Sequence, residues 1–137
     1  MSDTAVDPGE GPPAGAALWV LIADDDARVR DALGALIDDE PGMCLVGAAT
    51  DAESAVALAQ QGQAEVAVVD LVMPGGGLQA VRRLRQLRPP PLVIGLSSLG
   101  DRASAESMLA EGAAPFATKR AGDDLVQVIW EVARTCC

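Results

Sequence analysis

Residues 18–26 read LWVLIADDD, an apolar run that ends at once in three acids. An uninterrupted apolar run of this length is typical of a strand covered on both faces, as in a parallel sheet between helices. Four more short apolar runs follow along the chain. Five strands are therefore predicted: Leu18–Ala23, Cys44–Ala49, Glu65–Asp70, Leu92–Ser97 and Ala114–Thr118.

Amphipathic stretches separate these runs. Apolar residues recur at helical spacing after Asp26 and again from Leu125 to Val132, and three more helices are expected at Ala52–Gln61, Leu78–Leu87 and Arg102–Glu111. Alternating strands and helices with right-handed crossovers predict a doubly wound α/β sheet. Ligands of such sheets bind at the carboxyl ends of the strands, so the functional residues are expected there.

Length and composition narrow the class of protein. The 137 residues are 50% hydrophobic, enough for one core and short for two. Residues 1–16 are rich in proline, glycine and acids and are predicted to be a disordered tail, which leaves residues 17–137 as one folded domain. The net charge of −10 argues against direct binding of nucleic acid or anionic membranes. With neither a membrane-length apolar stretch nor a secretory signal recognisable, a cytoplasmic location is expected.

The cysteine and histidine content argues against a metal site with sulfur or imidazole ligands. Histidine is absent, and Cys44, Cys136 and Cys137 form no C-x-x-C pair, so neither a zinc site nor a disulfide framework is expected. Cys44 is predicted to be a core thiol.

Carboxylates follow two of the predicted strands. Asp24 and Asp25 come directly after the first strand, and Asp70 ends the third. Like charges about 4 Å apart repel by roughly 4 kcal/mol at an effective dielectric constant near 20, so such a cluster favours a bound cation. Magnesium prefers oxygen ligands of this kind. Asp26 is interpreted instead as the N-cap of the following helix.

A hydroxyl and an ammonium group are predicted at the same edge. Ser97 ends the fourth predicted strand, and Lys119 follows the fifth. Phosphoryl transfer depends on positioning and charge neutralisation, and carboxylates, a divalent metal, a hydroxyl and a lysine supply both. The pattern therefore predicts that Asp70 accepts a phosphoryl group.

Four segments carry a resemblance to a known family: Val20–Asp25, Val68–Gly75, Leu96–Ser98 and Gly112–Lys119. They resemble the motifs of response-regulator receiver domains of bacterial two-component systems, especially receivers that precede LuxR-type DNA-binding domains. The resemblance extends from Leu18 to the C-terminus. It implies a flavodoxin-like fold with five parallel strands in the order 2-1-3-4-5 and five flanking helices. It also implies a phosphorylation-dependent signalling switch rather than a turnover enzyme.

The resemblance assigns the acidic residues specific roles. Asp70 is implied to be the phosphoacceptor. Magnesium is implied to be bound by Asp24, Asp25, Asp70 and the backbone carbonyl of Val72. Val72 also stands at one of two positions that tune hydrolysis of the phosphoryl group in this family.

The second hydrolysis-tuning position is occupied by Leu99. Because Val72 and Leu99 are both apolar, a long-lived phosphoryl state is predicted. Ser97 and Lys119 are implied to bind the phosphoryl group, and Ser97 and Phe116 to form the conformational switch.

Partners also follow from the resemblance. A sensor histidine kinase would supply the phosphoryl group, and an output domain or a downstream protein would receive the signal, as in transcription regulation. A homodimer formed on phosphorylation through the last two helices is a further hypothesis, with Val126 and Trp130 on the exposed side.

The chain departs from the family pattern in two loops. The turn Gly75-Gly76-Gly77 is one residue shorter than usual, which predicts a mobile loop. The spacing from Lys119 to Leu125 is also one residue short, which would shift the start of the last helix. Four arginines on one predicted helix, Arg82, Arg83, Arg85 and Arg88, are interpreted as a solvated face.

Two alternatives remain open at this point. A magnesium-dependent phosphohydrolase of the haloacid-dehalogenase type could use Asp24, Asp26, Ser97, Lys119 and Asp123, although Arg28 stands where that family has threonine or valine. A receiver that acts as an interaction module without phosphorylation is disfavoured, because every residue that the chemistry needs is present.

Overall fold

The computed structural model describes residues 17–96, 102–116 and 122–135. Strands and helices alternate along this chain, as predicted: β1 (Leu18–Ala23), α1 (Ala27–Asp39), β2 (Met43–Ala49), α2 (Ala52–Gly62), β3 (Val66–Asp70), α3 (Gly77–Arg85), β4 (Leu92–Leu96), α4 (Arg102–Ala110), β5 (Ala113–Phe116) and α5 (Gly122–Thr135). The predicted tail, residues 1–16, lies outside the described residues.

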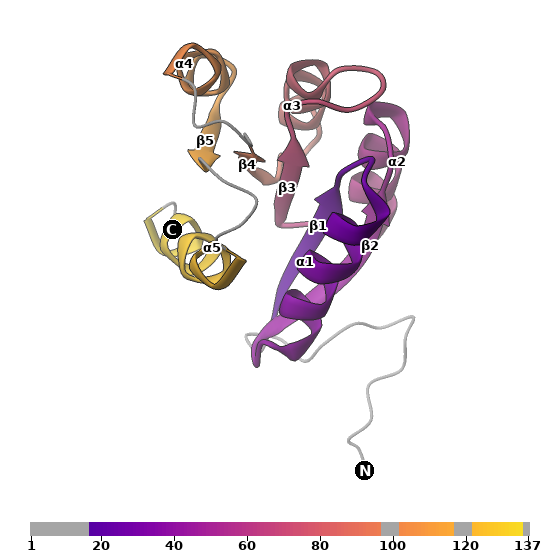
Figure 1. Ribbon diagram of the computed structural model, residues 1–137, viewed down its shortest axis with the longest axis vertical. Helices are drawn as coiled ribbons and strands as arrows, with labels where there is room; N and C mark the ends of the chain where they lie inside the picture. The colour runs from indigo at the N-terminus through magenta and orange to yellow at the C-terminus, as the bar shows by residue number, and fades with distance from the viewer. Residues whose placement is uncertain (1–16, 97–101, 117–121, 136–137) are drawn as a thin grey trace.

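All strand pairs are parallel, and the strands lie in the order β2-β1-β3-β4-β5. This confirms the doubly wound sheet and the strand order. Helices α1 and α5 cover one face of the sheet, while α2 and α3 cover the other (Figure 1). The central strand β3 is buried along its whole length, which explains why its sequence is apolar up to Asp70.

Several predicted boundaries are off by one or two residues. Helix α3 ends at Arg85 rather than Leu87, because the N–H groups of Gln86 and Leu87 bond to carbonyls three residues back, Arg83 and Leu84. Strand β3 begins at Val66 rather than Glu65. The predicted extensions of β4 to Ser97 and of β5 to Thr118 lie outside the described residues.

Cys44 is not the core thiol that was predicted. It is only partly buried, because β2 is an edge strand of the sheet. Its neighbour Met43 is the residue of β2 that enters the core beneath α1 and α5.

The prediction that Val126 and Trp130 lie on an exposed face of α5 is wrong. Both are partly buried and pack on the core cluster formed by α1, α5 and the sheet. The indole Nε1 of Trp130 donates a hydrogen bond to Glu40 Oε2 at the end of α1, 3.0 Å away. Trp130 therefore links α5 to α1.

None of the helices in the described part of the chain is both long enough and apolar enough to span a membrane.

Candidate functional site

Asp24 and Asp70 lie at the same edge of the sheet because β1 and β3 are neighbours. Ala23 pairs with Val69 in the parallel register, so the next residue of each strand is an aspartate. Asp24 is 0% exposed and Asp70 is 2% exposed, whereas Asp25 is exposed. Two carboxylates are thus buried where two apolar strands end.

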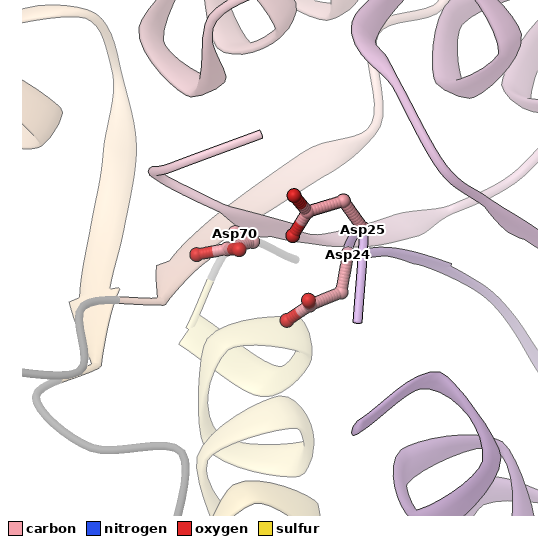
Figure 2. Close-up of side chains that lie close together, drawn as sticks. All are labelled: Asp24, Asp25 and Asp70. Carbon is pink, nitrogen blue, oxygen red and sulfur yellow. The ribbon is translucent and has the colours of Figure 1, made fainter. Parts of the chain in front are cut away.

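The three carboxylates converge on one point. One oxygen each from Asp24, Asp25 and Asp70 lie within 4.8 Å of one another, and Figure 2 shows their side chains gathered beside the ends of β1 and β3. Such close like charges are strongly unfavourable unless a cation or a proton offsets them. A set made only of oxygen donors suits a hard divalent ion such as Mg²⁺, so the residues present fit this metal.

Hydrogen bonds fix Asp24 on three sides. Its backbone N–H donates to Ala49 O at the end of β2, 3.0 Å away, and its carboxylate Oδ1 accepts the N–H of Asp26 at 2.9 Å. Its backbone carbonyl accepts a bond from Arg30 Nη1 at 2.9 Å. Asp24 is therefore held by the neighbouring strand, by the turn that follows and by helix α1.

Asp26 takes the capping role that was predicted. Its side chain accepts the N–H of Arg28 at 2.9 Å and forms the N-cap of α1. Its carboxylate is engaged with the helix that it starts.

The backbone after β3 folds back sharply on the strand end. Asp70 Oδ1 accepts the N–H of Val72 at 3.2 Å, and the N–H of Gly77 donates to Leu71 O at 3.1 Å. A Cβ on Gly77 would clash with the backbone of Asp70 and Leu71, so this close approach requires glycine.

Gly75 and Gly76 have positive φ values of 85° and 87°. The short triple-glycine turn therefore has a geometric explanation, and mobility of the loop stays a prediction.

Val72 is exposed to solvent, with 74% of its surface accessible. Ser97, Leu99 and Lys119 lie outside the described residues. The register nevertheless pairs Asp70 with Leu96 and Leu96 with Phe116, so β3, β4 and β5 all reach this edge. The backbone of Phe116 ends β5, while its side chain is not among those described.

Arg82, Arg83 and Arg85 of α3 are solvent-exposed, as predicted, whereas Arg88, also exposed, lies beyond the end of the helix. One arginine of α3 has a partner that the sequence did not indicate. Arg82 Nη2 lies 2.8 Å from Glu111 Oε2, across from α3 to the turn between α4 and β5. The hydrogen bond from Arg82 lowers the pKa of Glu111, and the same bond raises the pKa of Arg82. Arg30 is a second contact that no sequence signal marked, because its bond goes to a backbone carbonyl.

Comparison with known proteins shows which protein family this chain matches. The model of the response regulator receiver domain matches residues 20–130. The chain is 40% identical over 103 residues to a protein-glutamate methylesterase/protein-glutamine glutaminase of Thiobacillus denitrificans, covering 73% of this chain and 29% of that protein. It is 33% identical over 115 residues to response regulator GacA of Pseudomonas aeruginosa, covering 82% of this chain and 54% of GacA. The chain thus spans about half or less of these relatives.

A solved structure shows the same fold. A LuxR-family two-component response regulator from Aurantimonas superposes with a TM-score of 0.78 at 28% identity, over 85% of this chain and 84% of that one. These matches give no support to a phosphohydrolase of the haloacid-dehalogenase type.

Proposed function

Because this chain belongs to the response regulator receiver domains of two-component signalling, we propose that Asp70 accepts a phosphoryl group and thereby switches the domain. The observation that carries the proposal is the convergence of Asp24, Asp25 and Asp70, whose oxygens lie within 4.8 Å of one another at the carboxyl edge of the sheet. The domain acts as a signalling switch, and the division of the chain into a tail of residues 1–16 and one domain of residues 17–137 stays a prediction.

In the proposed reaction, a carboxylate oxygen of Asp70 attacks the phosphorus of a phosphohistidine on a sensor kinase. A new O–P bond forms as the P–N bond breaks, and the electron pair of that bond leaves with the imidazole, which takes up a proton from solvent. The bond from the Val72 N–H to Asp70 Oδ1 orients the attacking carboxylate.

Asp24, Asp25 and Asp70 would hold Mg²⁺ together with the Val72 carbonyl. When bound, Mg²⁺ supplies positive charge against the oxygens of the transferring phosphoryl group.

The other predicted site residues complete the proposal. Ser97 and Lys119 would bind the phosphoryl oxygens, and Ser97 with Phe116 would carry the switch. Phosphorylation adds charge and acceptor oxygens, which favours one of two arrangements of such residues. Val72 and Leu99 would restrict access of water to the phosphorus, so the isolated phosphoprotein is expected to outlast a seconds timescale.

Partners are proposed by family membership. A sensor histidine kinase donates the phosphoryl group, and an output domain or downstream protein responds, in the cytoplasm. A phosphorylation-dependent homodimer would have to use exposed side chains such as Leu109 of α4, which is 60% exposed, rather than Val126 and Trp130. An unchanged sedimentation profile after phosphorylation would count against this dimer.

The test is intact mass spectrometry after incubation with acetyl phosphate and MgCl₂. We expect one phosphoryl adduct on the wild type, none on Asp70→Asn, and little on Asp24→Asn. Asp26→Asn is the matched control, because asparagine keeps the helix cap while removing one acid at the same strand end. Its adduct should equal that of the wild type.

The other outcomes separate the alternatives. An adduct that survives loss of Asp70 but needs Asp24 would support a phosphohydrolase whose nucleophile follows the end of β1. The absence of any adduct, at every magnesium concentration, would support an interaction module that works without phosphorylation.

A further inference from the structure

Arg30 makes a contact at the acidic cluster that the proposed chemistry does not use. Its Nη1 donates to the backbone carbonyl of Asp24 at 2.9 Å. That carbonyl belongs to the peptide unit that joins Asp24 to Asp25. Because a peptide unit is planar, fixing the direction of its carbonyl also fixes its N–H and the course of the chain into Asp25. Arg30 therefore acts on the geometry between two of the three acids.

The hydrogen bond from Arg30 to the Asp24 carbonyl is expected to be strong. A charged donor on a carbonyl gives a stronger hydrogen bond than a neutral one, and the contact is partly buried. The other side of Asp24 is tied to β2 through its N–H and Ala49 O at 3.0 Å. The sheet thus holds the peptide before Asp24 through its N–H, and α1 holds the Asp24–Asp25 peptide through its carbonyl. Neither peptide unit is free to rotate.

A second arginine on the same helix lacks this role. The side chain of Arg28 is 95% exposed, and it approaches Asp26 only at 4.0 Å. Arg28 and Arg30 thus carry the same charge from the same helix turn, but only Arg30 bonds to the backbone of the acidic cluster. They form a natural pair of test and control.

We propose that Arg30 is a positioning residue, which holds the Asp24–Asp25 peptide in the geometry that lets both carboxylates bind a divalent cation. The inference rests on the proposed function, since it concerns the same magnesium site. It makes a prediction opposite in sign to simple electrostatics. Removing a positive charge beside three carboxylates should tighten binding of Mg²⁺ by Coulomb attraction alone, whereas losing a positioning residue should weaken it.

The experiment is a titration of the full chain with MgCl₂, in which ¹H–¹⁵N NMR spectra monitor binding at each step. In Arg30→Gln the Kd for Mg²⁺ is expected to rise about tenfold, as for the loss of one charge-assisted hydrogen bond. Arg28→Gln should stay within about twofold of the wild type or bind slightly tighter. Arg30→Lys, which keeps the charge and can still donate, should fall between. Arg30→Met, which keeps the apolar stem, is measured alongside in case Arg30→Gln does not fold.

A second readout needs no metal. In the metal-free protein, the backbone amide signal of Asp25 should move in Arg30→Gln and stay in place in Arg28→Gln. A purely structural role of Arg30 would lower the melting temperature without this selective change.

The results separate failure of the Arg30 proposal from failure of the proposed function. If the wild type binds Mg²⁺, Asp24→Asn does not, and Arg30→Gln binds as well as or better than the wild type, the magnesium site stands and the role of Arg30 is refuted. If the wild type binds no Mg²⁺, both proposals fall.

Discussion

Acidic residues have opposite surroundings at the two ends of the strands, called here the carboxyl edge and the amino edge of the sheet. At the carboxyl edge, Asp24 and Asp70 are at most 2% exposed and crowd against Asp25. At the amino edge, Glu65 is exposed, and its carboxylate accepts the N–H of Trp19 at 2.9 Å. A cavity of about 520 Å³ lies at the amino edge, between the loops that precede β3 and β4, and Glu65 is among its lining residues. In this molecule, concentrated buried charge marks the candidate site better than a hollow does.

Helix direction explains part of this difference. In a βα unit the helix begins at the carboxyl edge and ends at the amino edge. The carboxyl edge therefore receives helix N-termini, whose partial positive charge favours anions, while the amino edge receives helix C-termini. Acids at the carboxyl edge are better tolerated, and an anionic phosphoryl group would be too.

The largest expected effect is stabilisation of the carboxyl edge by magnesium. At a free Mg²⁺ concentration of roughly 100 times Kd, the free energy of unfolding should rise by about 2.7 kcal/mol, since only the folded protein assembles the site. Urea denaturation with and without MgCl₂ measures this. Asp24→Asn should lose the increment, and Glu65→Gln at the amino edge should keep it. Equal increments in both variants would show that the edges do not differ in this respect.

The next effect concerns glycines at the two edges. Gly77→Ala should destabilise the protein by about 2 kcal/mol, because the new methyl group meets backbone atoms of Asp70 and Leu71, which cannot move aside. Gly62→Ala, near the amino edge, meets only the side chain of Val46 on the edge strand and should cost about 1 kcal/mol.

Thermal denaturation of both glycine variants checks the order. Gly34→Ala in α1 is the control. Its methyl group would make an ordinary 3.4 Å contact with Leu45, so a gain of about 0.5 kcal/mol is expected from helix propensity. A Gly77→Ala protein as stable as the wild type would contradict the close packing of the turn.

A smaller effect follows from charge repulsion. Without metal, Asp70→Asn should stabilise the protein by about 1 kcal/mol at neutral pH, because one of three crowded carboxylates loses its charge. Glu65→Gln should change the stability little, since the group is exposed. Chemical denaturation in the presence of a chelator is the measurement. A destabilised Asp70→Asn would mean that attractive contacts of Asp70 outweigh the repulsion.

The smallest effect belongs to the ion pair of Arg82 with Glu111. Bonding to Arg82 lowers the pKa of Glu111 below its ordinary value near 4.5. A carboxylate with a lowered pKa contributes stability above its unfolded-state pKa, and this contribution disappears as the pH falls through the folded-state pKa. The melting temperature of the wild type should therefore converge on that of Glu111→Gln as the pH falls from the ordinary carboxyl value through the lowered folded-state pKa. A constant difference at all pH values would exclude the pair as the cause.

Much of the fold could be predicted because burial leaves a direct trace in the chain. Strands covered on both faces read as apolar runs, and this placed β1 without error and β3 to within one residue. The acids that interrupt such runs, Asp24 and Asp70, stand out for the same reason. Less could be predicted where a residue's surroundings come from distant segments. Val126 and Trp130 were expected on an exposed face, and Cys44 in the core, because helical or strand periodicity does not say which neighbour covers a face.

The sequence by itself determined the class of fold, the family and the acidic residues that meet at the strand ends, because these depend on local periodicity and on residue types. Only the tertiary structure decided which side chains make contacts between the elements. The bond from Arg30 to the Asp24 carbonyl, the ion pair of Arg82 with Glu111 and the contact of Trp130 with Glu40 join different elements. Such contacts depend on distances that arise only when the helices pack on the sheet, and no local pattern encodes them.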